Sequence, residues 1–167
     1  MSEVPEHLRH KPATELEQER ELVLVCPEFK SKVNLSRIVR LAGCAGVRRI
    51  IACGNAGVDS TITRDAMNYV RLEKRRSMIP VLKKLRSQGF RLVGLEQTDR
   101  SDCLFDYRYK RKTGLVIGHE RHGMLPEELS LVDDTIEIPV YGEPHSYNVA
   151  TATTMAVYEY CRQFPAG

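Results

Sequence analysis

The sequence predicts an α/β domain in which helices flank a mainly parallel sheet. Short apolar runs of strand length recur along the chain, and segments whose apolar residues have helical spacing separate them. No apolar run approaches the roughly 20 residues that a membrane span requires. The 167 residues, 42% of them hydrophobic, fit one globular domain. We expect this domain to occupy residues 21–167, after an N-terminal extension of residues 1–20.

The first half of the chain predicts two strands with a long helix between them. Residues 22–25 form an apolar run bounded by Pro27, and residues 49–53 form a second run closed by Gly54. Asn34 is expected to be the helix N-cap, and Gly46 is expected to end the helix. A separate short polar helix is expected from about Thr14. The long helix places its apolar residues on one stripe: Leu35, Ile38, Val39, Ala42 and Ala45.

The second half continues the alternation of strands and helices. After Thr63 the pattern allows helix or loop, and residues 78–87 then predict a helix that Gly89 ends. Further strands are expected at residues 90–95, 115–117 and 135–138, with a long loop over 98–112 and a short helix beginning at Pro126. The final segment has a helical stripe formed by Val149, Ala152, Ala156, Val157 and Tyr160. This order favours a parallel sheet.

Charge is distributed unevenly along the chain. The net charge is +3, but residues 22–112 hold 20 Lys and Arg against 8 Asp and Glu. A section this basic favours a surface patch that binds a polyanion such as nucleic acid, although solvated helix faces would give the same composition.

The cysteines and the N-terminus indicate a cytoplasmic protein. Five cysteines are widely spaced with no Cys-x-x-Cys pair, which fits neither a disulfide framework nor a zinc site. The first residues have no apolar core of a signal peptide. His119 and His122 flank Glu120, but the spacing is not His-Glu-x-x-His and no third ligand is evident. We therefore expect no membrane association and no metal.

The turn after the first strand excludes the usual dinucleotide fingerprint. Residues 26–32 read Cys-Pro-Glu-Phe-Lys-Ser-Lys and contain no glycine, so Gly-x-Gly-x-x-Gly is missing. Walker-type phosphate loops and Gly-x-Ser-x-Gly elbows are missing as well. A nucleotide-like cofactor would have to bind by another route.

Three segments in order indicate that route. The first runs from Asn34 to Arg40 and continues as Ala-Gly-Cys-Ala-Gly over residues 42–46. The second, residues 115–123, is Leu-Val-Ile-Gly-His-Glu-Arg-His-Gly. The third contains Ile-Pro-Val-Tyr-Gly at 138–142 and Ser-Tyr-Asn-Val at 146–149. Together they closely resemble the three motifs of the SpoU (TrmH-like) family of SPOUT RNA methyltransferases, over about residues 22–163.

The resemblance implies a fold and an activity. The fold is an α/β-knot with a deep C-terminal trefoil knot, a rare exception to unknotted topology. The activity is transfer of a methyl group from S-adenosyl-L-methionine to a ribose 2′-hydroxyl of RNA. The cofactor would lie in the knot loops, bound largely by backbone groups, and the enzyme would be a homodimer. By position, the residues around the cofactor are Leu95, Gly118, Ile138, Pro139, Ser146 and Tyr147.

The resemblance also implies the chemical roles. The family often uses the arginine at the position of Arg40 as a general base. Because a neutral guanidine is costly, we expect Arg40 instead to stabilise the developing alkoxide and anchor a phosphate, with the acceptor of the hydroxyl proton left open. Glu120 would hold Arg40 through a bidentate pair. Asn34 is equally well explained as an N-cap or as an amide that orients Arg40, while Ser146 and Asn148 would begin the last helix and line the substrate side. His119 and Tyr147 depart from the residues usual in the family.

Two alternatives to an active enzyme remain open. A catalytically silent RNA-binding module would keep the same fold, but it would not need Asn34, Arg40, Glu120, Ser146 and Asn148 together. An unrelated nucleotide-binding α/β protein is disfavoured by the missing glycine turn. With an extension of only 20 residues, we expect tRNA rather than rRNA as the substrate.

Overall fold

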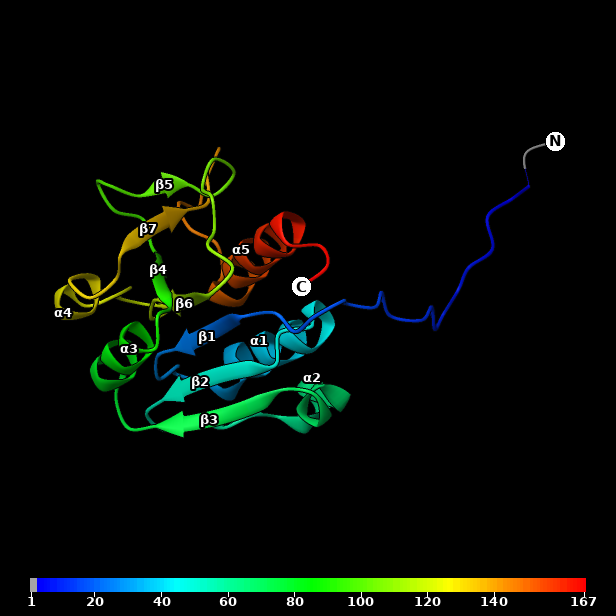
Figure 1. The fold of residues 1–167 in the computed structure, drawn as a ribbon, viewed down its shortest axis with the longest axis horizontal. Helices are drawn as coiled ribbons and strands as arrows, with labels where there is room; N and C mark the ends of the chain where they lie inside the picture. Colours follow the sequence, from blue (N-terminus) through cyan, green and yellow to red (C-terminus); the bar gives the residue numbers. More distant parts are fainter. Residues whose placement is uncertain (1–2) are drawn as a thin grey trace.

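Seven strands form one parallel sheet in the order β3-β2-β1-β6-β4-β7-β5 (Figure 1). The computed structural model describes residues 3–167. The strands are β1 Leu22–Cys26, β2 Arg49–Cys53, β3 Arg71–Arg75, β4 Arg91–Leu95, β5 Asp102–Cys103, β6 Thr113–Ile117 and β7 Asp134–Glu137. The predicted α/β class with a parallel sheet is confirmed.

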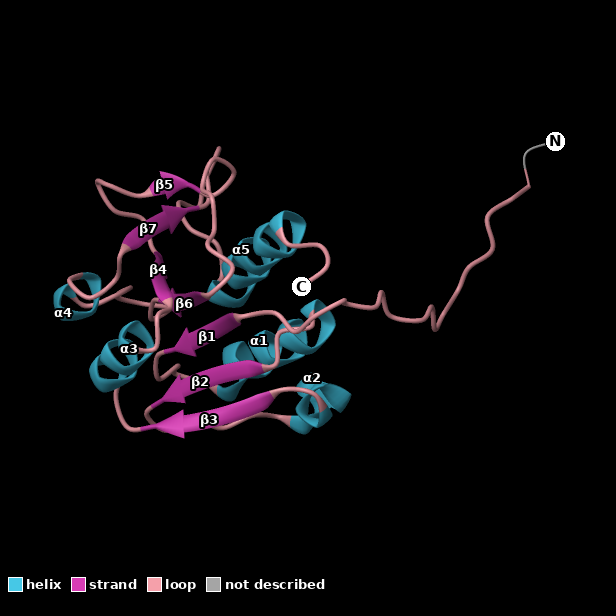
Figure 2. Cartoon of the chain, viewed as in Figure 1, coloured by secondary structure: helices cyan, strands magenta, loops and turns pink. Residues whose placement is uncertain are grey.

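Helices cover both faces of this sheet (Figure 2). They are α1 Lys32–Ala45, α2 Ser60–Thr63, the 3₁₀ helix η1 Arg64–Asn68, α3 Met78–Ser87, α4 Pro126–Leu129 and α5 Val149–Gln163. The buried residues of α1 and α5 belong to one apolar cluster and those of α3 to the other, because neighbouring residues of a buried strand point to opposite faces. The domain therefore has three layers.

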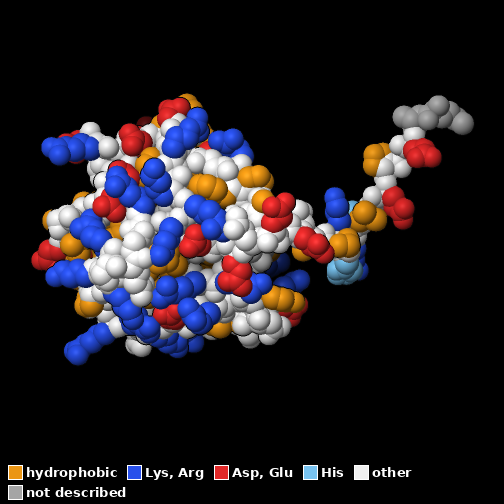
Figure 3. Space-filling view, in the orientation of Figure 1, with side chains coloured by type: hydrophobic (Ala, Val, Ile, Leu, Met, Phe, Trp, Pro, Cys, Tyr) orange, Lys and Arg blue, Asp and Glu red, His pale blue; other side chains and the backbone are white. Residues whose placement is uncertain are grey.

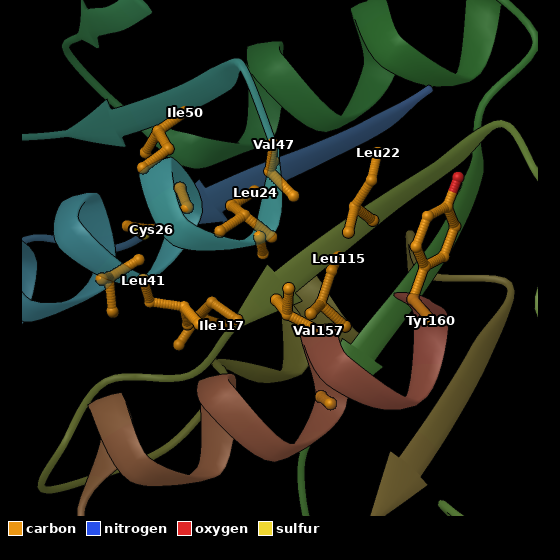
Figure 4. Packing of buried hydrophobic residues seen from close by; sticks show 14 of the residues in the cluster. Leu22, Leu24, Cys26, Leu41, Val47, Ile50, Leu115, Ile117, Val157 and Tyr160 are labelled. Carbon is orange, nitrogen blue, oxygen red and sulfur yellow. The ribbon is translucent and has the colours of Figure 1, made fainter. Parts of the chain in front are cut away.

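The larger cluster joins the central strands to the first and last long helices (Figure 4). Leu24 and Leu115 come from β1 and β6, and Val157 packs on them from α5. Tyr160 is fully buried, and its hydroxyl donates a hydrogen bond of 2.6 Å to the carbonyl of Arg111. This packing fixes α5, and with it the loop that leads into α5.

Several elements occupy the residues that the sequence predicted. The apolar stripe of α1 is buried throughout, and Gly46 ends the helix in the left-handed conformation with φ 70°. α3 spans Met78–Ser87, and Gly89 follows it with φ 84°. The short helix beginning at Pro126 is present as well.

Two local predictions are wrong. Asn34 lies inside α1, and Ser31 caps the helix by accepting a hydrogen bond from the amide of Val33. No helix begins near Thr14. The guanidinium of Arg20 instead donates to the carbonyls of Ala45 and Phe164, and these contacts hold the neighbouring backbone extended along the ends of α1 and α5.

Two strands were not predicted. β3 is a polar edge strand without apolar alternation, and β5 has only two residues, which lie within the expected loop 98–112. Within residues 3–167 no helix is both long enough and apolar enough to cross a membrane, and all five cysteines are free thiols.

Candidate functional site

A pocket of about 430 Å³ opens where the carboxyl ends of three neighbouring strands meet. All strands are parallel, so the loops that follow β4, β6 and β7 leave the sheet at the same edge. The start of α5 closes the pocket. Its lining residues are Leu95, Glu96, Gln97, Ile117, Gly118, His119, Glu120, Arg121, Gly123, Glu137, Ile138, Val140, Ser146, Tyr147, Asn148, Val149 and Ala152.

The structure gathers most of the predicted site residues in this pocket. Of the six expected around the cofactor, five line it: Leu95, Gly118, Ile138, Ser146 and Tyr147. Pro139 does not line it, although Ile138 and Val140 on either side do. Glu120 and Asn148 are also in the wall. The second and third sequence motifs therefore form one concave surface.

Asn148 connects this pocket to the first motif. Its Oδ1 accepts hydrogen bonds from the amides of Ala150 at 2.9 Å and Thr151 at 3.3 Å, which makes it the N-cap of α5. Its Nδ2 donates to Oδ1 of Asn34 at 3.2 Å. Both ends of the amide are engaged, so its orientation is fixed. The predicted N-cap position at Asn148 is confirmed.

Glu120 is held from one side only. Its Oε1 accepts a 2.7 Å hydrogen bond from the amide of Lys30, in the loop after β1. Its Oε2 is buried, lies 3.3 Å from Nε2 of His119 and accepts no hydrogen bond from residues 3–167. A buried carboxylate oxygen without a donor is costly. The Glu120 Oε2 atom can therefore accept a hydrogen bond from a donor that residues 3–167 do not supply.

The predicted pair between Arg40 and Glu120 is absent within one chain. Arg40 is exposed and makes no hydrogen bond or ion pair with the described part of the chain. Arg40 lies six residues, or about 1.7 helical turns, after Asn34, so the two side chains leave α1 on different faces, and Asn34 is the one that contacts the pocket residue Asn148. Asn34 cannot orient Arg40 in this arrangement.

Glu96 is a pocket residue that sequence reasoning missed. Its Oε2 accepts a 2.7 Å hydrogen bond from the amide of Met124, which ties the loop after β4 to the loop after β6. A Cβ placed on Gly118 would lie 2.8 Å from the same oxygen, so a larger residue would displace the Glu96 carboxylate from its hydrogen bond with Met124. The position of Glu96 directly after a predicted strand was the signal that could have found it.

The charge of the pocket is negative. Glu96, Glu120 and Glu137 contribute carboxylates, whereas Arg121 contributes a single guanidinium. The rings of His119 and His122 stack 4.0 Å apart at 6°. No group of three or more His, Cys, Asp and Glu side chains that could hold a metal occurs among the described residues. The pocket therefore suits an organic cation with apolar parts.

A sequence profile of the SpoU rRNA Methylase family matches residues 21–158. The tRNA (guanosine(18)-2′-O)-methyltransferase of Aquifex aeolicus is 29% identical over 150 residues, which cover 87% of this chain and 71% of that protein. The 23S rRNA (uridine(2479)-2′-O)-methyltransferase of Streptomyces viridochromogenes is 29% identical over 143 residues, covering 80% of this chain and 50% of that protein.

Solved structures give the same result. The A. aeolicus TrmH/SpoU tRNA modifying enzyme superposes with a TM-score of 0.83 at 28% identity, over 90% of this chain and 78% of that one. The SpoU methyltransferase AviRb from S. viridochromogenes, in complex with the cofactor AdoMet, superposes with a TM-score of 0.77 at 27% identity, over 93% and 67% of the two chains.

Proposed function

Because this chain belongs to the SpoU rRNA methylase family, we propose that it transfers a methyl group from S-adenosylmethionine to a ribose 2′-hydroxyl of RNA. The observation that carries the proposal is the convergence of the three motifs at one pocket. Glu120 and Asn148 line that pocket, and Asn34 is hydrogen-bonded to Asn148. Residues 114 positions apart in sequence meet there.

The pocket fits the cofactor in size and charge. A volume of about 430 Å³ lies within the range of small-molecule sites. The apolar side chains of Leu95, Ile117 and Ile138 suit an adenine ring, and the carboxylates favour a ligand that carries sulfonium and ammonium charges. When bound, S-adenosylmethionine supplies the methyl group that is transferred.

The residues of this chain then position the acceptor hydroxyl. Methyl transfer requires the hydroxyl oxygen and the methyl carbon to approach within about 3–3.5 Å in line. The fixed amide of Asn148 offers a defined hydrogen-bonding direction at the mouth of the pocket. Glu120 Oε2 is available to accept a hydrogen bond from the substrate or from a second protomer. Arg40 has no hydrogen-bond or ion-pair partner among residues 3–167, so it is available to stabilise negative charge elsewhere.

We propose that Arg40 stabilises negative charge that develops at the pocket of a second copy of the chain. Arg40 does not line the pocket of its own chain, whereas Glu120 and Asn148 do. A homodimer in which Arg40 of one protomer reaches the pocket of its partner would complete the site. The exposed position of Arg40 on α1 and the donor that Glu120 Oε2 lacks both support this arrangement.

We propose a tRNA as the RNA substrate and the cytoplasm as its location. The A. aeolicus relative acts on tRNA and aligns with 87% of this chain. The S. viridochromogenes relative acts on 23S rRNA and aligns with 80%. The catalytically silent alternative is disfavoured because Glu120 and Asn148 both line the pocket and Asn34 is hydrogen-bonded to Asn148.

The decisive experiment follows the methyl group and the cofactor separately. Calorimetry with S-adenosylmethionine, in the presence of a chelator, should show binding to the purified protein. Radiolabelled methyl transfer to unmodified tRNA and rRNA transcripts, followed by nucleoside analysis, should show label on a ribose of tRNA. Cofactor binding without transfer to any RNA would favour the silent module, and absence of cofactor binding would contradict the proposal.

A further inference from the structure

Two arginines of the edge strand β3 and one of its neighbour β2 surround a single carboxylate on β3. Glu73 lies 2.7 Å from Nε of Arg49, 3.0 Å from Nη2 of Arg71 and 2.9 Å from Nη2 of Arg75. These contacts, chiefly the hydrogen bond from Arg49, hold the pKa of the Glu73 carboxyl below its usual value. Because one carboxylate compensates only one guanidinium, the group keeps a positive excess. We call these four residues the Glu73 cluster.

The unequal exposure of the cluster presents that excess to solvent. The side chain of Glu73 is 13% exposed, whereas those of Arg71 and Arg75 are 71% and 45% exposed. The neighbouring Lys74 and Arg76 are exposed as well. Lys and Arg side chains gather over the part of the surface where β3 lies (Figure 3). The surface is therefore built with the anion inside and the cations outside.

The arrangement suits an extended polyanion. A strand rises about 3.3 Å per residue, so Arg71 and Arg75 lie about 13 Å apart along β3 and on the same side of it. This spacing applies to the backbone, and the guanidinium groups converge on Glu73, which leaves their outward N–H donors for a ligand. A nucleic acid backbone presents phosphates at regular intervals, and arginine forks bind phosphate oxygens in pairs.

The cluster lies on the α3 face of the sheet, and its last residue reaches the sheet edge at which the cofactor pocket opens. Arg75 is the last residue of β3 and pairs with Cys53, the last residue of β2. β1 and β6 follow in the sheet, and three strand spacings correspond to about 14 Å. The carboxyl end of β3 is thus within reach of an RNA that enters the pocket.

A second cavity adjoins the cofactor pocket on the side of β1. Gly54, whose amide donates to the carbonyl of Arg75 at 2.9 Å, lies against the side chain of Glu28. Glu28 lines a cavity together with Lys30, His119 and Arg121, and the last two residues also line the cofactor pocket. A chain of contacting residues therefore links the carboxyl end of β3 to the pocket wall.

We propose that the Glu73 cluster binds backbone phosphates of the RNA beside the nucleotide that enters the cofactor pocket. This inference rests on the proposed function. Glu73 holds the guanidinium groups in place before the RNA arrives, so fewer side-chain rotamers are lost on binding. A competing role for the same charges is to prevent β3 from pairing with the edge of another sheet.

The test compares two variants that each lose two positive charges. R71Q/R75Q removes the exposed arginines of the cluster, and R100Q/K110Q removes two exposed cations between β4 and β6. Affinity for an unmodified tRNA transcript is measured from low to moderate salt, with thermal melting to establish folding. Each lost phosphate contact should reduce the slope of log affinity against log salt by about 0.7–0.9. R71Q/R75Q should therefore lower it by about 1.4–1.8.

The control variant and the measurement of cofactor binding distinguish failure of this inference from failure of the proposed function. R100Q/K110Q should change the slope much less, and both variants should bind S-adenosylmethionine as the wild type does. A wild-type slope for R71Q/R75Q, or an equal loss in the control, would overturn the inference and leave the edge-protection role. Failure of the wild-type protein to bind any RNA would overturn the inference together with the RNA substrate, whereas cofactor binding would still be measured.

Discussion

At the scale of single residues, the pocket depends on groups whose hydrogen bonds leave them no freedom. Asn148 has its amide oxygen and nitrogen both engaged, and Glu96 bridges two loops through Met124. Sequence reasoning found Asn148 because its residue type fits a helix N-terminus. It missed Glu96 because a glutamate after a strand has no distinctive signature, and it misplaced Asn34 because Ser31, three residues earlier, supplies the cap.

Substitution of Gly118 tests how closely the loop after β6 packs against Glu96. A Cβ on Gly118 would lie 2.8 Å from Glu96 Oε2 and 3.2 Å from the amide of Met124, so Gly118→Ala should push the loop into the pocket. We expect cofactor affinity to fall at least about tenfold, which corresponds to about 1.4 kcal/mol. Gly142→Ala is the matched control because nothing lies within 4 Å of its Cβ. Calorimetry on both variants decides, and equal affinities would contradict the packing argument.

At the scale of elements, the spacing of apolar residues predicted those helices whose position is determined by packing against the sheet. The stripe of α1 and the bounds of α3 follow from buried faces, which a sequence displays directly. β3 was missed because its residues Arg-Leu-Glu-Lys-Arg have no strand-like apolar pattern. Its strand conformation depends instead on pairing with β2, which lies about 20 residues earlier in the chain. The same polar composition that concealed the strand makes its edge a candidate RNA surface.

The strand β7 is attached to β4 by a charge pair with a pH signature. Asp134 accepts hydrogen bonds of 2.8 Å from Nε and Nη2 of Arg91 and of 2.7 Å from the Tyr107 hydroxyl. The pKa of the Asp134 carboxyl is lowered, mainly by the hydrogen bonds from Arg91. A depressed folded pKa contributes stability above the unfolded value of about 3.9, and this contribution is lost as pH falls through the folded value.

Asp134→Asn should therefore destabilise the protein at neutral pH and reduce the loss of stability on acidification below about pH 4. Denaturant unfolding of wild type and variant at neutral and acidic pH measures this difference. Asp99→Asn provides the comparison, since the Asp99 side chain is 88% exposed. A difference between wild type and Asp134→Asn that is the same at both pH values would contradict the assignment.

At the scale of the whole molecule, the sequence motifs predicted the fold and the pocket, but not which residues share a chain. Motif order places Glu120 and Asn148 together, whereas the face of α1 that carries Arg40 follows only from the three-dimensional structure. The trefoil knot that the resemblance implies stays a prediction, as does the boundary at residue 20.

Subunit complementation tests the shared site. Arg40→Ala should abolish transfer and preserve cofactor binding, because Arg40 lies outside its own pocket. Asn148→Asp keeps the oxygen that caps α5 but loses the nitrogen that donates to Asn34, so it should also be inactive. Co-expression with two affinity tags yields heterodimers in which one of the two sites has both residues intact. They should recover up to about half of the wild-type activity per dimer, and an inactive heterodimer would place both residues in one site of a single chain.

The meeting of Asn34 and Asn148 also fixes when the pocket can exist during synthesis. The two residues are 114 positions apart, and α5, which holds the second one in place, is the last helix of the chain. When β1 and α1 of a growing chain have left the ribosome, the pocket cannot form until nearly all of the later strands and α5 have been synthesised. Contacts of such long range form slowly. Cofactor binding would consequently report the completion of folding, and a chain stalled before α5 would have no means of recognising the methyl donor.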